Sequence, residues 1–488
     1  MKPLELLKSR AHDNWLVGQD NQAFLALTEA LIQEFAAIAP ATGQVTEGHS
    51  ILLAESDPVR FLAGFLAAHA TAQRVFLGNP DWGAVEWQQA LAMAQPDRVW
   101  GDRAIGTQLE ALNTSSTAQF ERLTAPVLPM APALATKRLI LIPTGGSSGH
   151  IRFVAHHWET LAAAVWGLQQ CFQSAAIHSI CTLPLYHVSG LMQFMRSLLS
   201  GGALWLITFQ DLKTGPPTLV DPSDWFISLV PTQLQALLEN AALAHWLAQC
   251  KTVFIGGAPS WPALLQQARS LGIPLAPCYG MTETAAQIAT LKPAAFLAGN
   301  QSVGQVLPHA QVMIVDEHRQ PVAPGTSGQI QIAAASLAWG YYPTDTFAPP
   351  TDRELTSPPF FPTDDMGFLD DQGYLTLVGR LSNKIITGGE NVFPAEVEAA
   401  IRATGLVTDI AVLGTPDPYW GQCVTAVYVP HDSTPSVHAM DTALQANIAR
   451  FKRPKVWVPV EALPRNAQGK LNHQTLQAIA AQWQQAQA

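Results

Sequence analysis

A continuous run of apolar residues, RLILIP at residues 138–143, leads directly into a loop of glycines and hydroxyl side chains at residues 144–149. A short apolar run bounded by glycines predicts a buried strand. A strand that ends in such a loop can present backbone N–H groups to a phosphate, because glycines permit close approach and hydroxyls add donors. The loop is not the P-loop of kinases and GTPases, which requires GxxxxGK[ST], since His150 follows Gly149. A phosphate-binding loop and an ordinary turn both explain this segment taken alone.

The segments around this strand alternate between two kinds of hydrophobic pattern. Short apolar runs at residues 50–55 and 74–77 predict buried strands. Helical spacing at residues 21–37 and small apolar residues at 61–72 predict helices. Residues 225–238, WFISLVPTQLQALL, predict a strand, a Pro-Thr turn and a helix. This alternation predicts an α/β (mixed) fold of layered sheets and helices.

Composition narrows the classes of protein to which the chain can belong. Of its 488 residues, 48% are hydrophobic and 13% are charged, which indicates a globular chain. The formal net charge of −10 argues against a nucleic-acid-binding surface, which needs a basic field. Five cysteines without CxxC spacing suggest neither a zinc site nor a disulfide framework, and they fit a reducing cytosol. Without a signal-peptide pattern or a long apolar run, we expect a cytoplasmic protein with no transmembrane segment.

A second polar segment lies in the last third of the chain. Residues 363–367, TDDMG, predict a polar turn that carries carboxylates, and residues 374–378 predict a short strand before Arg380. Residues 387–391, TGGEN, predict a glycine turn, and Pro394 opens a predicted helix with acidic residues in its first turn. Two ordinary turns around a hairpin would explain this segment equally well on its own.

Taken in order, these motifs resemble the adenylate-forming superfamily, which includes acyl- and aryl-CoA ligases, nonribosomal adenylation domains and luciferases. The residues that carry the resemblance in the second segment are Thr363, Asp365, Gly367, Gly379, Arg380, Gly388, Gly389, Glu390, Asn391, Pro394 and Glu396. The resemblance implies that Asp365 binds the ribose hydroxyls of ATP and that Arg380 assists. It also implies a hinge at Asn383, where the family usually has Asp or Lys. The hinge would join a large multi-subdomain N-terminal domain, residues 1–382, to a small mobile α+β domain, residues 383–488.

The Gly/Ser loop is similar to the TSGTTGxPKG loop of the same superfamily, which binds ATP. The residues that match are Thr144, Gly146, Ser147, Ser148 and Gly149. The residues that depart from it are Gly145 for Ser, Ile151 for Pro, Arg152 for Lys and Phe153 for Gly. The family's loop lysine contacts the leaving pyrophosphate, so the resemblance gives this catalytic role to Arg152. Arginine keeps the charge of lysine but not its shape.

The segment PCYGMTET at residues 277–284 is the most specific local match in the large domain. Its resemblance to the family implies that Tyr279 offers a flat face to adenine, that Gly280 belongs to the ATP site and that Thr282 donates to the α-phosphate. Glu283 would supply an oxygen ligand for Mg²⁺. An aromatic turn before a helix would explain the segment in isolation.

The motif LPLYHVSG, together with SLVPTQL further on, is especially similar to o-succinylbenzoate–CoA ligases of menaquinone and phylloquinone synthesis. The resemblance implies that His187 borders and gates the acyl pocket, although a lone histidine is commonly a core residue. Ser189, Gly257 and Ala258 would line the substrate site, and Gly257 would also lie against the adenine of ATP. Arg196 is a cation among core-facing residues and therefore needs a partner. That partner is either a protein carboxylate or the aromatic carboxylate of a dicarboxylic substrate, held by a two-pronged contact.

The segment LPRNAQGKL at residues 463–471 matches the family's catalytic-lysine motif and gives that role to Lys470. The resemblance implies that Lys470 first bridges the carboxylate and the α-phosphate. Rotation at Asn383 would then bring the Gly388-Gly389 loop against the channel for CoA.

The expected function is an acid–CoA ligase that uses ATP, Mg²⁺, CoA and a small aromatic carboxylic acid, with o-succinylbenzoate preferred. The alternatives are another aryl- or fatty acyl-CoA ligase, a non-catalytic adenylate-forming fold, and a phosphotransferase. A monomer and a homodimer are both compatible with the sequence.

Overall fold

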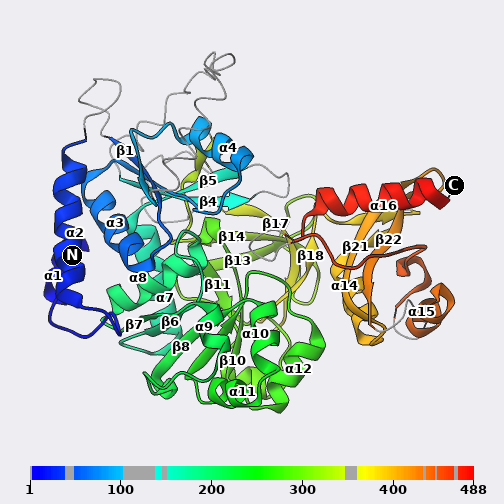
Figure 1. Cartoon of the computed structure of the whole chain (residues 1–488). Helices are drawn as coiled ribbons and strands as arrows, with labels where there is room; N and C mark the ends of the chain where they lie inside the picture. The colour runs from blue at the N-terminus through cyan, green and yellow to red at the C-terminus, as the bar shows by residue number, and fades with distance from the viewer. Residues whose placement is uncertain are drawn as a thin grey trace.

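The described residues form four sheets, with helices packed around them (Figure 1). The computed structural model describes residues 3–38, 49–102, 138–145, 151–343, 345–346, 360–388, 390–431, 436–445, 448–465 and 471–487. Two sheets have seven strands each, and the sheet at the C-terminal end lies to one side of them (Figure 1). The alternating patterns of the sequence predict such a mixed α/β fold, and this prediction is confirmed.

The first sheet is formed mainly by N-terminal strands. Its strands are β1 (Ser50–Ala54), β2 (Arg74–Leu77), β3 (Arg98–Gly101), β4 (Leu139–Gly145), β5 (Ile151–His156), β15 (Gly340–Tyr342) and β16 (Asp345–Thr346). Helices α1 (Pro3–Ser9), α2 (Asn21–Ala36), α3 (Pro58–Thr71) and α4 (Ala84–Ala94) belong to the same part of the chain. The order is β16-β15-β5-β4-β2-β1-β3, with β1 parallel to both β2 and β3. Every residue of β1 is buried, as expected for a parallel strand covered on both faces.

The second sheet has a run of parallel strands at its centre. Its strands are β6 (His178–Cys181), β7 (Leu204–Leu206), β8 (Trp225–Leu229), β9 (Thr252–Ile255), β10 (Leu275–Met281), β11 (Ala286–Thr290) and β12 (Gln305–Val306). The helices are α7 (Trp158–Phe172), α8 (Val188–Ser200), α9 (Phe209–Lys213), α10 (Pro231–Leu238), α11 (Ala241–Ala248), α12 (Pro262–Ser270) and α13 (Pro293–Leu297). The order is β12-β11-β10-β9-β8-β6-β7. Because β6, β8, β9 and β10 are parallel neighbours, their carboxyl ends lie along one edge.

The third and fourth sheets follow in the second half of the chain. The third consists of β13 (Ala310–Val315), β14 (Gly328–Ala334), β17 (Phe361–Leu369) and β18 (Leu375–Arg380), all antiparallel. The fourth consists of β19 (Ile385–Thr387), β20 (Glu390–Val392), β21 (Val407–Asp417), β22 (Gly421–Pro430) and β23 (Val456–Pro459). Helices α14 (Pro394–Ala403), α15 (Val437–Leu444) and α16 (His473–Gln487) accompany this last sheet. A separate hydrophobic cluster, which includes Ile385, Val397 and Trp457, forms its core.

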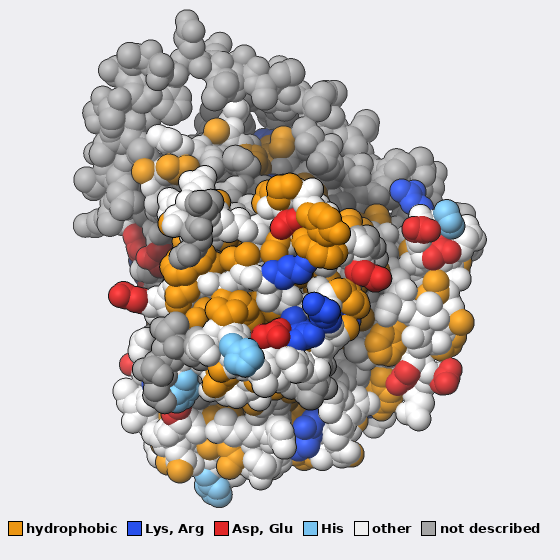
Figure 2. Space-filling model, turned by 90° about the vertical axis from the view of Figure 1, so that its right-hand side faces the viewer, with side chains coloured by type: hydrophobic (Ala, Val, Ile, Leu, Met, Phe, Trp, Pro, Cys, Tyr) orange, Lys and Arg blue, Asp and Glu red, His pale blue; other side chains and the backbone are white. Residues whose placement is uncertain are grey.

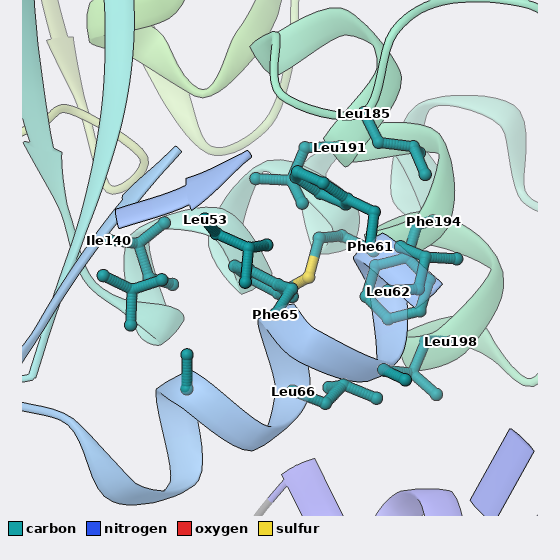
Figure 3. Close-up of a cluster of buried hydrophobic side chains, with 14 of the residues drawn as sticks. Leu53, Phe61, Leu62, Phe65, Leu66, Ile140, Leu185, Leu191, Phe194 and Leu198 are labelled. Carbon is teal, nitrogen blue, oxygen red and sulfur yellow. The ribbon is translucent and has the colours of Figure 1, made fainter. Parts of the chain in front are cut away.

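A large hydrophobic core lies between α3 and α8 (Figure 3). Phe61 and Phe65 of α3 gather with Leu191, Phe194 and Leu198 of α8 in this core (Figure 3). These five side chains are at most 1% exposed, so one face of α8 is fixed against the N-terminal helices. The opposite face of α8 therefore lies toward the second sheet.

Two local predictions differ from the structure. The sequence predicts a turn at residues 363–367, but these residues lie within β17, where Asp365 pairs with Arg380 of β18. The flanking antiparallel strands provide hydrogen-bond partners that outweigh the turn propensity of Asp and Gly. Likewise, Thr144 and Gly145 extend β4, because β5 runs back alongside them.

Within the described part of the chain, no helix is both long enough and apolar enough to span a lipid bilayer.

Candidate active site

Several of the residues that the motifs single out lie where parallel strands end. Gly256 and Gly257 follow β9, and Tyr279 and Gly280 lie near the end of β10. His187 precedes α8, shortly after the end of β6. In open α/β sheets, ligands bind at this carboxyl edge. The topology therefore brings segments far apart in the sequence to one place.

Tyr279, Asp365 and Arg380 form one hydrogen-bonded group. The Tyr279 phenol donates to Asp365 Oδ2 at 2.7 Å, and Arg380 Nε donates to Asp365 Oδ1 at 3.1 Å. Burial of Tyr279, followed by the negative charge of Asp365, raises the pKa of the phenol, so the hydroxyl keeps its proton. Each carboxylate oxygen has a further lone pair that can accept a hydrogen bond from a ligand hydroxyl.

The Thr282–Thr284 segment is a 3-10 turn that joins β10 to β11 and is held by side chains from elsewhere. His156 Nε2 lies 2.7 Å from the Thr282 carbonyl oxygen, and Ser336 Oγ donates to the Thr284 carbonyl oxygen at 2.8 Å. Burial lowers the pKa of His156 to about 4, so the ring is neutral near pH 7 and its Nε2 carries the donated proton. These bonds fix the corner from which Thr282 and Glu283 project.

Tyr341 connects a cation to a carboxylate. Its hydroxyl donates to Glu283 Oε1 at 2.5 Å. The guanidinium carbon of Arg152 lies 4.3 Å from the centre of the Tyr341 ring, which is a cation–π distance. Arg152 stands on β5 directly opposite Thr144 of β4. The structure thus brings Arg152 and Glu283 together through a residue that the motifs did not indicate.

The position of Glu283 fits a magnesium ligand. Its side chain is buried, and one carboxylate oxygen accepts the bond from Tyr341. The structure gives the other oxygen no partner among the described residues. Mg²⁺ commonly takes one or two carboxylates together with substrate phosphates and water. A single buried carboxylate with one oxygen that the described residues leave free therefore matches the donor set that this ion uses with nucleotides.

Arg196 is a buried cation that no described carboxylate neutralises. Its side chain is 5% exposed, and its Nη2 donates to Gln287 Oε1 at 2.5 Å. The guanidinium carbon lies 5.5 Å from the centre of the Phe254 ring. Burial lowers the pKa of Arg196 to about 10, so the group is still charged at neutral pH. Within the described residues, the structure therefore does not support the ion pair with a protein carboxylate that the sequence left open.

Helix α8 carries both Arg196 and the residues expected to border the acyl pocket. His187 is its N-cap residue, and Ser189 is exposed in its first turn. Its C-terminal end is held by Arg10, which donates to the carbonyl oxygens of Ser197 and Gly202 at 2.8 Å each. A cation bonded to the last carbonyls of a helix stabilises that end. The helix is therefore fixed at its C-terminus and along its hydrophobic face.

At two positions of the motifs, glycine is required for steric reasons. Gly257 has a φ of +78°, in the left-handed region that side chains disfavour. A Cβ on Gly280 would lie 1.9 Å from the carbonyl oxygen of Ala286, so only glycine permits β10 and β11 to approach here. Ala258, beside Gly257, is exposed at the same edge.

Asn383 and Gly388 lie in turns on either side of β19. The turn that contains Asn383 is bonded to β17, since the Ser382 N–H donates to Asp364 Oδ1 at 3.0 Å. A Cβ on Gly388 would lie 2.8 Å from the Trp420 ring. The predicted site residues that fall outside the described residues are Gly146, Ser147, Ser148, Gly149, Gly389 and Lys470.

Basic residues at 452–455 lie on the C-terminal part of the chain. Lys455 Nζ is 3.4 Å from the centre of the exposed Trp420 ring, and Lys452 pairs with Glu396 at 2.6 Å. Arg453 Nη1 donates to both carboxylate oxygens of Asp441 at 3.1 Å. Figure 2, which views the side on the right of Figure 1, shows hydrophobic side chains next to Lys and Arg side chains.

Sequence reasoning missed three side chains at the site: His156, Gln287 and Tyr341. Each lies on a strand, and two of them are buried polar residues among apolar neighbours. A polar side chain at a buried strand position must find a partner, and that is the signal that could have identified His156 and Gln287.

Comparison with known proteins is consistent with this arrangement. The family model described as AMP-binding enzyme matches residues 44–342, and the AMP-binding enzyme C-terminal domain matches residues 396–470. A 2-succinylbenzoate–CoA ligase from Enterococcus faecalis is 34% identical over 331 residues, which cover 67% of this chain and 67% of that protein. A 2-succinylbenzoate–CoA ligase from a Geobacillus species is 28% identical over 474 residues, which cover 95% and 94% of the two chains.

Solved structures show the same fold at lower identity. The o-succinylbenzoate CoA synthetase of Bacillus subtilis, in complex with its acyl-adenylate intermediate, superposes with a TM-score of 0.79 at 22% identity, covering 96% of this chain and 97% of that one. ATP-bound MatB from Rhodopseudomonas palustris has a TM-score of 0.80 at 22% identity and covers 98% of both chains. With both family models matched in order along its length, the chain belongs to the AMP-binding enzymes of the adenylate-forming superfamily.

Proposed function

We propose that this protein is an AMP-forming acid–CoA ligase that converts 2-succinylbenzoate to its CoA thioester with ATP and Mg²⁺. The observation that carries the choice of acid is Arg196, a charged side chain that is 5% exposed and has no carboxylate partner among the described residues. A buried charge of this kind is costly unless an opposite charge joins it. The relatives named 2-succinylbenzoate–CoA ligase support the same choice.

ATP would bind at the carboxyl edge of the second sheet. Asp365, held by Tyr279 and Arg380, would accept hydrogen bonds from the ribose hydroxyls, while the Tyr279 ring would face adenine. Thr282 would donate to the α-phosphate from the corner that His156 fixes. Mg²⁺ bound to Glu283 would neutralise charge on the triphosphate. The solved o-succinylbenzoate CoA synthetase with ATP and magnesium supports this pair of ligands for a chain of the same fold.

The acid would lie between α8 and the nucleotide. Arg196 would hold its aromatic carboxylate, which is remote from the reacting centre, while His187, Ser189, Gly257 and Ala258 would border the rest of the molecule. The succinyl carboxylate would face the α-phosphate. Because a carboxylate is already a nucleophile, the first step requires alignment and charge neutralisation but no general base.

In the first half-reaction, an oxygen of the succinyl carboxylate forms a bond to the α-phosphorus and the bond to pyrophosphate breaks. Arg152, beside Tyr341, would stabilise the charge on the departing pyrophosphate together with the loop at residues 144–149. Lys470 would bridge the carboxylate and the α-phosphate as they approach. The product is the acyl adenylate.

In the second half-reaction, the CoA sulfur bonds to the acyl carbon, the acyl–phosphate oxygen bond breaks, and AMP leaves. The thiol proton passes to solvent. We place a hinge at Asn383 between residues 1–382 and 383–488, whose rotation would withdraw Lys470 and bring the loop at Gly388 and Gly389 toward CoA. The separate hydrophobic core of the C-terminal sheet supports its movement as a unit. Lys455, over the exposed Trp420 ring, is a candidate contact for the CoA phosphates.

The deciding experiment measures pyrophosphate release with ATP, Mg²⁺ and a panel of acids: 2-succinylbenzoate, benzoate, a phenylalkanoate and a medium-chain fatty acid. We expect release with 2-succinylbenzoate at a kcat/KM at least about a hundredfold above the others, since their monocarboxylates leave Arg196 unpaired. Preference for a monocarboxylate would indicate another acyl-CoA ligase. If none of the acids gives pyrophosphate release, the protein is a non-catalytic member of the family. ADP in place of AMP as the product would indicate a phosphotransferase.

We expect the reaction to take place in the cytosol, which accords with five free cysteines.

A further inference from the structure

The contact between Arg196 and Gln287 fixes the orientation of the glutamine side chain. Nη2 of Arg196 lies 2.5 Å from the Gln287 atom that faces it. A guanidinium can only donate hydrogen bonds, so the facing atom must be the amide oxygen. The amide nitrogen of Gln287 therefore points away from the N–H that Arg196 donates. Its two N–H groups have no hydrogen-bond partner among the described residues, although the side chain is 8% exposed.

The backbone of Gln287 is held tightly in place. Gln287 lies opposite Gly280 in the antiparallel pair of β10 and β11. A Cβ on Gly280 would lie 2.5 Å from the Gln287 Cα, so these two strands are closer than any side chain would allow. Gln287 thus stands between Arg196 of α8 and the segment that carries Tyr279 and Thr282. Its amide cannot move away from Arg196 without a rotation of its own side chain.

We propose that Gln287 is a second donor to the remote carboxylate of the acid, acting beside Arg196. This inference rests on the proposed function and adds to it a specificity-determining residue. The amide oxygen orients the guanidinium, and the amide nitrogen donates to a carboxylate that Arg196 attracts. Two donors from different elements favour an anionic end group over a hydroxyl or methyl group, because a neutral group leaves both the cation and the amide unsatisfied.

The test compares 2-succinylbenzoate with an analogue in which a methyl group replaces the aromatic carboxylate. The measured quantity is the ratio of the two kcat/KM values for pyrophosphate release, which we call the discrimination ratio. Gln287→Met keeps the size of the side chain and removes both polar atoms. The Gln287→Met substitution is made both in the wild-type chain and in the Arg196→Met variant. In that variant Gln287 has no guanidinium to orient. Thr290→Val, a buried substitution on the same strand, is the matched control.

We expect Gln287→Met to lower the discrimination ratio by about tenfold to a hundredfold in the wild-type chain, since the lost bond is to a charged group. In the Arg196→Met chain we expect a further fall of at least about threefold, with Thr290→Val unchanged. No further fall in that background would overturn the inference and leave Gln287 as a residue that only positions Arg196. An unchanged ratio in the wild-type chain would also overturn it.

A second variant covers the case in which Gln287→Met does not fold. Gln287→Glu puts a carboxylate against Arg196 and should abolish preference for the dicarboxylate while activity on the methyl analogue persists. Equal preference in Gln287→Glu and the wild type would overturn the inference. The proposed function fails separately, if the wild-type protein itself releases no pyrophosphate with 2-succinylbenzoate.

Discussion

The Tyr279 hydroxyl donates a 2.7 Å hydrogen bond to Asp365, joining two residues 86 positions apart in the chain. The bond connects the second sheet to the third, since Tyr279 lies on β10 and Asp365 on β17. It holds one carboxylate oxygen in place while Arg380 holds the other. The two ends of the proposed nucleotide site are therefore connected before any ligand arrives.

Replacement of Tyr279 by Phe keeps the flat ring and removes this bond. We expect the KM for ATP to rise by about tenfold, because a hydrogen bond to a charged acceptor is lost and Asp365 is held on one side only. The KM for the acid should change little. Pyrophosphate-release kinetics at varied ATP measure the effect, with Tyr428→Phe, a tyrosine buried in the C-terminal core, as control. An unchanged KM for ATP would show that Asp365 does not depend on Tyr279.

Replacement of Arg196 by Ala should reduce kcat/KM for 2-succinylbenzoate by about a hundredfold or more, since the remote carboxylate would enter a buried site without a counter-charge. Activity on the methyl analogue should fall far less. The comparison uses the two acids at saturating ATP, with Arg319→Ala, an exposed turn residue, as control. Equal losses with both acids would point to damage of the fold and not to loss of carboxylate recognition.

Lys470→Ala tests the division of labour between the two half-reactions. We expect it to abolish acyl-adenylate formation, because the cation that bridges the carboxylate and the α-phosphate is removed. Thioester formation from chemically prepared acyl adenylate and CoA should continue at nearly the wild-type rate. Both rates can be followed separately, with Lys213→Ala, an exposed lysine on α9, as control. Similar losses in both half-reactions would contradict a rotation that removes Lys470 from the site.

His156 should make the stability of the protein depend on pH. Its pKa is about 4 in the folded protein against a usual 6.5, because burial disfavours the charged ring. The unfolded chain therefore binds a proton first as the pH falls, so stability is complete above pH 6.5 and is lost progressively toward pH 4. From these values, His156 should cost about 2 kcal/mol of the free energy of unfolding between pH 7 and pH 5.

Urea titrations at the two pH values measure this loss. His156→Gln should show a smaller loss than the wild type, although His69 and His309, which burial also holds at a pKa of about 4, contribute in the same direction. His318→Gln, at an exposed position, should behave as the wild type. Identical pH dependence in His156→Gln and the wild type would show that burial does not lower the pKa of His156.

Local patterns predict the elements well where a single segment supplies its own signal. Residues 74–77 are β2, and residues 225–238 contain β8 followed by α10, as their pattern predicts. The same approach failed at residues 363–367, which became a strand because β14 and β18 pair with them on both sides. Composition favoured a turn there, but the strand partners are distant in the sequence or lie beyond a tight turn.

The sequence by itself determined the order and chemistry of the motifs: a Gly/Ser loop after a strand, an aromatic–hydroxyl–acid segment, a carboxylate and a distant lysine. Only the tertiary structure decided which side chains face one another across sheets. Arg196 meets an amide 91 residues away, and the Thr282 carbonyl meets a histidine 126 residues away. The reason is physical: spacing along the chain controls contacts within a turn or a strand, whereas partners across a sheet depend on topology and on which buried polar groups still lack a bond.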